Sequence, residues 1–154
     1  MRKNITQIRD MELIESELRS NVAGVLALNY GSEKITQIAT PFIYQDKNIY
    51  IFFNNENEIF ENIHFDDSAS FTIIKTGKAK KRSDLGFYPT YSFLSISVTG
   101  TIKNVEDAKL IEDLRQSYLV KYKRSMEGEI DLFALGRVII IDSEEIQAFE
   151  ETGG

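Results

Sequence analysis

The 154-residue sequence has no cysteine, no tryptophan, one histidine and two prolines. Without cysteine there are neither disulfide bonds nor thiolate chemistry, and one histidine excludes a multi-histidine metal site. The net charge of −6 argues against a general nucleic-acid binder. The N-terminus carries Arg2 and Lys3 followed by acidic and polar residues, which is typical of neither a signal peptide nor a membrane span. We therefore expect a cytoplasmic protein that contacts neither membrane nor nucleic acid.

The sequence is instead rich in apolar and aromatic residues. Hydrophobic residues make up 42% of the chain, and there are 7 tyrosines and 10 phenylalanines. A chain of this length buries roughly 68–70% of the surface of its unfolded state. Neither a repeat nor a linker divides the sequence, so we predict one globular domain over residues 1–154.

Apolar runs separated by short turns predict a mainly β protein. The predicted strands are Val22–Tyr30, Ile35–Tyr44, Asn48–Phe53, Ala69–Ile74, Phe93–Val105 and Leu135–Ile141. Consecutive strands without long intervening helices favour antiparallel pairing. We expect an α+β protein built on a six-stranded antiparallel split β-barrel with flanking helices. Pro41 lies inside the second strand and indicates a bulge, an edge or a bend toward a ligand.

Three amphipathic patterns predict the helices. Ile5–Leu18 has apolar residues at spacings of three and four, and Glu106–Tyr122 has a longer stripe of the same kind. Asn104 is the expected cap of this second helix. Between them, Ile59, Phe60 and Ile63 share one face of a short helix.

The stretch from Asn48 to Ile74 is the first candidate for ligand binding. It is predicted to form a strand, a helix cap, the short helix, a turn and a strand, and a helix N-terminus next to a strand edge favours anions. Residues 77–90 form a predicted long loop that follows Lys75 and carries several basic residues: Lys78, Lys80, Lys81 and Arg82. A solvated basic loop is the simpler interpretation, and a phosphate-binding loop is the alternative.

The order and spacing of these segments resemble a known family. The segments are Ala23–Ala27, Ala39–Phe42, Asn48–Ile51, Glu61–Ile63, Ala69–Phe71, Val98–Ile102, Val105–Asp107, Lys121–Tyr122, Arg137–Asp142 and Glu144–Ile146. Together they resemble the FMN-binding split β-barrels related to pyridoxamine 5'-phosphate oxidase, in particular the nitroimidazole-resistance-type flavin-binding proteins. The resemblance covers nearly the whole chain.

This resemblance implies a homodimer with two flavin sites at its interface, each contacted by both chains. It also implies a flavin-dependent oxidoreductase in which FMN carries the electrons and the protein orients it. No catalytic residue is identifiable from the pattern. The alternative is a non-enzymatic module that sequesters flavin or haem. His64 is the one strong candidate for a haem ligand, although a structural role is the simpler interpretation.

The phosphate-binding positions of the family differ in this sequence. In the family, the turn after the third strand carries Ser or Thr and an Arg-Lys pair, whereas the matching positions here are close to Asn57, Glu58 and Ile59. Losing two charged hydrogen bonds, each worth roughly 1.5–3 kcal/mol, lowers affinity by about 10² to 10⁴. Either FMN binds weakly, or other cations replace the pair, or this branch has lost FMN.

We place the expected site where the edge of Ile38–Phe42 meets Phe53–Asn57, closed by the basic loop of the same or the partner chain. The expected cofactor-binding residues are Ala39, Thr40, Phe42, Phe53, Asn54, Asn57, Lys80, Lys81 and Arg82. Near the end of the loop, three aromatic residues are candidates for stacking on a flavin ring or for interface packing: Tyr88, Tyr91 and Phe93. Four acidic residues near the C-terminus are interpreted as a solvated tail: Glu144, Glu145, Glu150 and Glu151.

Overall fold

A computed structural model describes residues 2–31, 34–53, 58–77, 86–123 and 136–154. The strands are β1 Lys3–Ile8, β2 Gly24–Tyr30, β3 Lys34–Thr40, β4 Ile43–Gln45, β5 Asn48–Phe53, β6 Ser68–Gly77, β7 Tyr91–Val105 and β8 Arg137–Gly153. The helices are α1 Met11–Ser20, α2 Glu58–Glu61 and α3 Ala108–Tyr122. The described residues therefore form eight strands, and the predicted number of six was too low.

The strands form one antiparallel sheet in the order β3-β2-β6-β7-β8-β5-β4, with β1 added alongside β8. The strands at the two ends of this order, β3 and β4, are separated in the chain by Pro41 and Phe42 alone. Because two residues join the opposite edges, the sheet has to curl until these edges meet. The result is a barrel that is split at the link between β3 and β4, which confirms the predicted fold class.

The break at Pro41 corrects one predicted strand. Ile35–Tyr44 is not continuous, because β3 ends at Thr40 and a new strand, β4, begins at Ile43. Proline has no backbone N–H and cannot donate to a strand ladder. The first half of the segment therefore pairs with β2 and the second half with β5.

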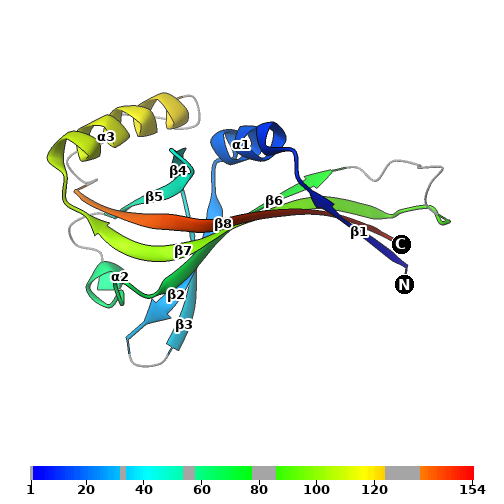
Figure 1. Ribbon diagram of the computed structural model, residues 1–154, viewed down its shortest axis with the longest axis horizontal. Coiled ribbons are helices and arrows are strands. Elements are labelled where there is room, and N and C mark those ends of the chain that lie inside the picture. The colour runs from blue at the N-terminus through cyan, green and yellow to red at the C-terminus, as the bar shows by residue number, and fades with distance from the viewer. Residues whose placement is uncertain (1, 32–33, 54–57, 78–85, 124–135) are drawn as a thin grey trace.

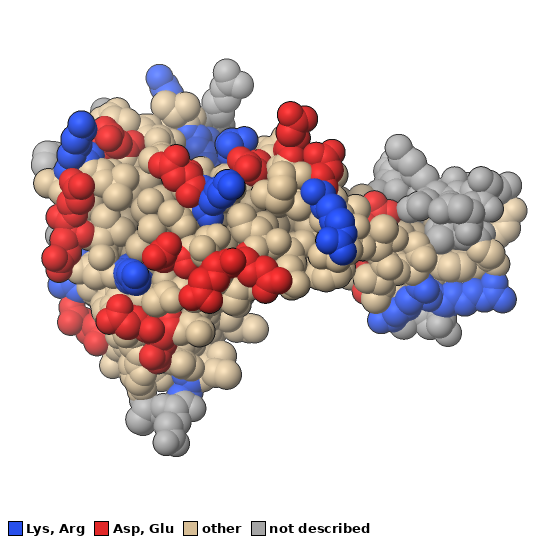
Figure 2. Space-filling view, in the orientation of Figure 1, with Lys and Arg blue, Asp and Glu red and all other residues tan. Residues whose placement is uncertain are grey.

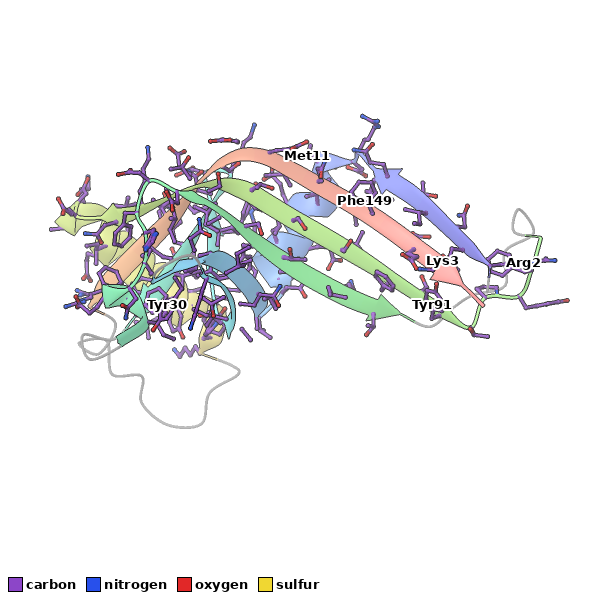
Figure 3. All side chains as sticks on the ribbon, turned by 90° about the horizontal axis from the view of Figure 1, so that it is seen from below. Arg2, Lys3, Met11, Tyr30, Tyr91 and Phe149 are labelled. Atoms are coloured by element: carbon purple, nitrogen blue, oxygen red, sulfur yellow. The ribbon has the colours of Figure 1, made fainter. Side chains whose placement is uncertain are left out.

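β7 and β8 are the longest strands, with 15 and 17 residues, and they extend beyond the barrel. Together with β1 and the end of β6 they form a narrow arm whose tip carries both chain termini (Figure 1). Arg2 and Lys3 lie near this tip (Figure 3). The last strand therefore does not end at Ile141 as predicted.

The acidic residues near the C-terminus are part of β8 and not a solvated tail. Glu151 pairs with Lys3 at 3.4 Å and accepts a hydrogen bond from the Tyr91 hydroxyl at 2.9 Å. Glu144 accepts a hydrogen bond from Thr101 at 3.1 Å. Their strand conformation follows from pairing with β7 over the full length of β8. Figure 2 shows acidic side chains scattered over the body of the molecule.

The predicted helix Ile5–Leu18 is also corrected. Its first part is the strand β1, which pairs with the C-terminal part of β8, and the helix α1 begins only at Met11. Asp10 is the N-cap, because its carboxylate accepts hydrogen bonds from the backbone of Glu12 at 3.1 Å and Leu13 at 3.3 Å.

The other two helices differ less from the prediction. α3 begins at Ala108, and its N-cap is Asp107 rather than Asn104, which lies in β7. The Asp107 carboxylate accepts the backbone N–H groups of Lys109 and Leu110 at 3.0 and 3.3 Å. α2 is a single turn that ends before Ile63, and Ile63 forms an isolated bridge with Tyr30.

The two faces of the sheet are covered differently. On the inner face, Ile14 and Leu18 of α1 pack into the main core. α3 packs on a second cluster around Tyr50 and Val138, which the strand register places on the opposite face. Figure 1 shows both helices in the upper part of the view, with α3 over the barrel and α1 nearer the arm.

The opposite side, which we call the outer face, carries exposed apolar side chains. The strand register places on it Ile5 (59% exposed), Val25 (38%), Ile35 (78%), Ile74 (60%) and Phe149. Seen from this side, the strands of the arm lie in front of α1 (Figure 3). Among the described residues, α3 covers the part of this face formed by β4, β5 and the start of β8, and no helix covers the part formed by β2, β3 and β6.

Candidate ligand-binding site on the outer face

The outer face is hollowed where β3, β2 and β6 lie next to one another. The cavity has a volume of about 500 Å³. Its lining residues are Ala23, Gly24, Val25, Ala27, Gln37, Ala39, Ser70, Thr72 and Ile74. This volume is within the range of sites that bind small molecules and cofactors, roughly 300–1,000 Å³.

Small side chains create this hollow. Ala27 and Ala39 project little from the sheet, so a flat ligand can approach the backbone closely there. On the inner face, a Cβ atom on Gly24 would lie 2.4 Å from the buried Phe71 ring and 2.8 Å from the Thr72 carbonyl oxygen, so only glycine fits at this position.

The polar groups of the hollow are few and uncharged. Thr72 lies 3.0 Å from the hydroxyl of Ser97, with which it shares a hydrogen bond. The side chains of Ser70 and Gln37 add a hydroxyl and an amide. An apolar floor with a few neutral donors and acceptors is typical of sites for planar organic ligands.

The structure places the sequence-predicted residues at different depths. Ala39 lines the hollow, and Thr40 follows it at the end of β3, where its hydroxyl donates to the Pro41 carbonyl at 3.1 Å. Phe42 and Phe53 are buried, with the Phe42 ring 4.6 Å from Phe71 and Phe53 packed edge-on against α2. The predicted Asn and basic residues lie outside the described residues: Asn54, Asn57, Lys80, Lys81 and Arg82.

The link between β3 and β4 is held by the last turn of α3, which sequence reasoning treated only as part of a helical stripe. The Tyr122 hydroxyl lies 2.7 Å from the carbonyl oxygen of Val22 and accepts the N–H of Phe42 at 3.0 Å. Lys121 donates to the Phe42 carbonyl at 2.9 Å. These contacts fix the backbone on both sides of the hollow, because Val22 precedes Ala23 and Phe42 follows the end of β3.

Burial changes the pKa values of both side chains in this clamp. Desolvation raises the pKa of Tyr122 to about 12 and lowers the pKa of Lys121 to about 8. Tyr122 is therefore a neutral hydrogen-bonding group at neutral pH.

Arg137 is a cation that sequence reasoning did not single out. It begins β8 opposite Phe53, the last described residue of β5, and its guanidinium lies 4.7 Å from the ring of Phe60. It also forms an ion pair with Glu61. Its position near the start of the predicted strand Leu135–Ile141 was the available signal.

The remaining candidates lie away from the hollow. His64 is half exposed and lies 3.6 Å from Asp67. Tyr91 and Phe93 stack on each other in the arm, with ring centroids 6.1 Å apart, and Tyr88 is exposed nearby. In the part of the chain that the structure describes, no three His, Cys, Asp or Glu side chains gather as metal ligands. No helix in that part is both long and apolar enough to cross a lipid bilayer.

The topology and the split between β3 and β4 define an antiparallel split β-barrel with the fold of the pyridoxamine 5'-phosphate oxidase-like proteins. A candidate 5-nitroimidazole antibiotic resistance protein from Bacteroides thetaiotaomicron is similar, with a TM-score of 0.70, 14% identity and coverage of 99% of this chain and 90% of that chain. The family resemblance predicted from the sequence is thus confirmed for the fold.

Two further solved structures share this fold. A FAD-binding protein from Mesorhizobium loti has a TM-score of 0.67 and 19% identity, and the match covers 95% of this chain and 97% of that one. A candidate pyridoxamine 5'-phosphate oxidase from Corynebacterium glutamicum has a TM-score of 0.61 and 18% identity, with 100% and 98% covered. No family model and no curated protein matches the sequence.

Proposed function

We propose that this protein binds a flavin, FMN, in the hollow on the outer face and acts as a flavin-dependent oxidoreductase. The observation that carries this proposal is the hollow itself, whose floor of small side chains lies on the exposed face of a split barrel. The likeness to a FAD-binding protein of the same fold supports a flavin as the ligand.

The residues of the hollow suit a flavin ring system. Ala27 and Ala39 leave room for a flat ring against the sheet, and Gln37, Ser70 and Thr72 offer neutral hydrogen-bonding groups for its polar edge. A bound flavin supplies the electron transfer. This chain orients the ring and keeps water from one of its faces.

The phosphate of FMN requires cations, since it carries close to two negative charges. The lining of the hollow contributes no charged side chain among the described residues. We propose the basic residues Lys80, Lys81 and Arg82 for this role, as expected from the sequence. Arg137 is a second candidate for binding the phosphate, because it pairs with Phe53 at the end of β5.

We further propose that two copies form a homodimer through their outer faces. Ile5, Val25, Ile35 and Ile74 leave a broad apolar surface in contact with water in the single chain. A second copy on this surface would bury these side chains and cover the hollow. The site would then be shared by two chains, as the family resemblance implies.

A flavin titration with two matched variants tests the site. Ala39→Phe places a large ring in the hollow, and we expect it to weaken FMN binding by more than about tenfold, or ~1.4 kcal/mol. Ala108→Phe makes the same change at an exposed position on α3 and should leave the affinity unchanged. Flavin fluorescence measures both affinities. Equal FMN binding by wild type and Ala39→Phe would exclude the hollow.

The same titration with riboflavin separates the ring from the phosphate. Loss of Lys80, Lys81 and Arg82, each changed to alanine, should weaken FMN but not riboflavin if these residues bind the phosphate, and Arg137→Ala tests the second candidate in the same way. Haem and FAD are titrated in parallel. If the wild type binds haem and no flavin, the alternative of a haem-binding module replaces this proposal.

A further inference from the structure

A second cavity lies between α1 and α3. It has a volume of about 510 Å³ and lies over β4, and we call it the interhelical groove. Its walls include Arg19 from α1, Ile43 and Tyr44 from β4, and Val120 and Lys121 from α3. It shares no lining residue with the hollow on the outer face.

The charged side chains that line the groove are both basic. Arg19 and Lys121 line it, whereas none of its lining residues is acidic. The other lining residues with polar side chains are Tyr44, Gln45, Gln116 and Ser117. The nearest ion pair joins Arg19 to Glu15 at 2.6 Å, one turn away on the same helix. That pair is partly exposed, where ion pairs are worth only about 0–1 kcal/mol, so Arg19 can also contact a ligand.

Lys121 carries its positive charge at a partly buried position. Its ammonium group lies 3.8 Å from the centre of the Phe42 ring and donates one hydrogen bond to the Phe42 carbonyl. An ammonium group has three N–H donors. Burial lowers the pKa of Lys121, and a nearby anion would restore the stability of its charged form.

The groove also has an apolar surface. Tyr44, which is only 6% exposed, lines it, and next to it Ile43 and the highly exposed Val120 (80%) give the groove apolar contacts. These features suit a ligand with an apolar body and one anionic group.

We propose that the interhelical groove binds a small organic monocarboxylate, with its carboxylate between Arg19 and Lys121 and its apolar body against Ile43, Tyr44 and Val120. A polyphosphate or a nucleotide fits less well, because it carries several negative charges. The groove has two cations, one of them already paired with Glu15, and an apolar floor, which suits a ligand with a single negative charge. This inference does not depend on flavin binding, since the two cavities are separate.

Calorimetric titration with 2-naphthoate tests the charge requirement, and its neutral isostere 2-naphthamide is the matched probe. We expect 2-naphthoate to bind at least about fivefold more tightly than the amide, or ~1 kcal/mol. Equal affinity for the two probes, or no binding of 2-naphthoate at millimolar concentration, would overturn the proposal.

Three variants place the binding site. Arg19→Gln and Lys121→Gln should each weaken 2-naphthoate at least about fivefold, or ~1 kcal/mol. Lys103→Gln removes the same charge from β7, outside the groove, and should change the affinity less than about twofold, because exposed distant charges are screened by salt. Arg19 is exposed and its variant should stay folded even if loss of Lys121 disturbs the Phe42 link. Unchanged binding by Arg19→Gln would contradict the proposed site.

Competition with FMN separates this site from the proposed flavin site. Saturating FMN and the Ala39→Phe variant should both leave the 2-naphthoate affinity unchanged. If FMN displaces 2-naphthoate, the probe occupies the hollow and the proposal for the groove is wrong. If FMN does not bind at all, the proposal for the groove still stands on the Arg19 and Lys121 variants.

Discussion

Lys121 couples the stability of this fold to pH. Its pKa is lowered by burial from its ordinary value of 10.5 to about 8, so between these values the unfolded chain binds more protons than the folded one. The free energy of unfolding should therefore rise with pH above about 8. Because the pKa of Tyr122 is raised to about 12, its ionisation in the unfolded chain opposes this rise above pH 10.

Lys121→Met should remove this rise, since methionine has a similar length and no charge. Urea unfolding of wild type and variant on both sides of pH 8 measures the slope. Lys103→Met is the control, because Lys103 is half exposed and pairs with Asp142 at 3.3 Å. The assignment to Lys121 is wrong if the Lys121→Met variant keeps the wild-type slope.

Single residues near the predicted site illustrate what sequence position reveals. Ala39 was predicted near the ligand and does line the hollow, whereas the Phe42 ring packs against Phe71 in the core. Both lie close to Pro41 in the sequence. Whether a side chain points into the hollow or into the core depends on how the chain bends at Pro41. The sequence pattern of apolar residues is the same in both cases.

At the scale of elements, the β7–β8 pair depends on a glycine at its irregularity. The register shifts between Thr99 and Gly100, where a Cβ atom on Gly100 would lie 2.0 Å from the carbonyl oxygen of Asp142. Gly100→Ala should therefore destabilise the protein by roughly 1–3 kcal/mol, because the backbone has to move apart.

Chemical denaturation compares this variant with Gly77→Ala. A Cβ atom on Gly77, at the end of β6, would meet no atom within 4 Å, so this variant should have wild-type stability. If both variants unfold at the wild-type denaturant concentration, the close approach at Gly100 does not limit the pairing of β7 with β8.

The helix predicted at Ile5–Leu18 shows why edge strands escape sequence reasoning. β1 lies at the edge of the sheet, and its side chains are mostly exposed, so its sequence lacks the apolar alternation of a core strand. Its partner residues in β8 are at least 140 residues away in the chain, as in the pair Ile8 and Ala148. The prediction from local periodicity therefore extended helix α1 in the N-terminal direction into this strand.

At the scale of the whole molecule, the outer face makes a testable prediction about assembly. Ile74→Asp places a charge on this face in the lining of the hollow, where burial against a second copy would cost the desolvation of the carboxylate. We expect light scattering to give a dimer for wild type and the 17.6 kDa monomer for the variant. FMN binding should weaken together with dimerisation.

Val120→Asp provides the control for this experiment. Val120 is also an exposed apolar residue, but it lies on α3 and lines the interhelical groove, not the hollow. This variant should remain dimeric. A wild-type protein that is monomeric at micromolar concentration, or a Val120→Asp variant that alone dissociates, would contradict assembly through the outer face.

The sequence by itself determined the mainly β fold, the strands of the barrel and the long helix α3, because these depend on local apolar periodicity. Only the tertiary structure decided the pairing of β1 with β8, the two-residue link that splits the barrel, and the clamp of Tyr122 on Val22 and Phe42. The two cavities also arise only there, because each is lined by segments far apart in the chain. Periodicity reports which residues are buried, whereas contacts between distant segments depend on how the whole sheet curls.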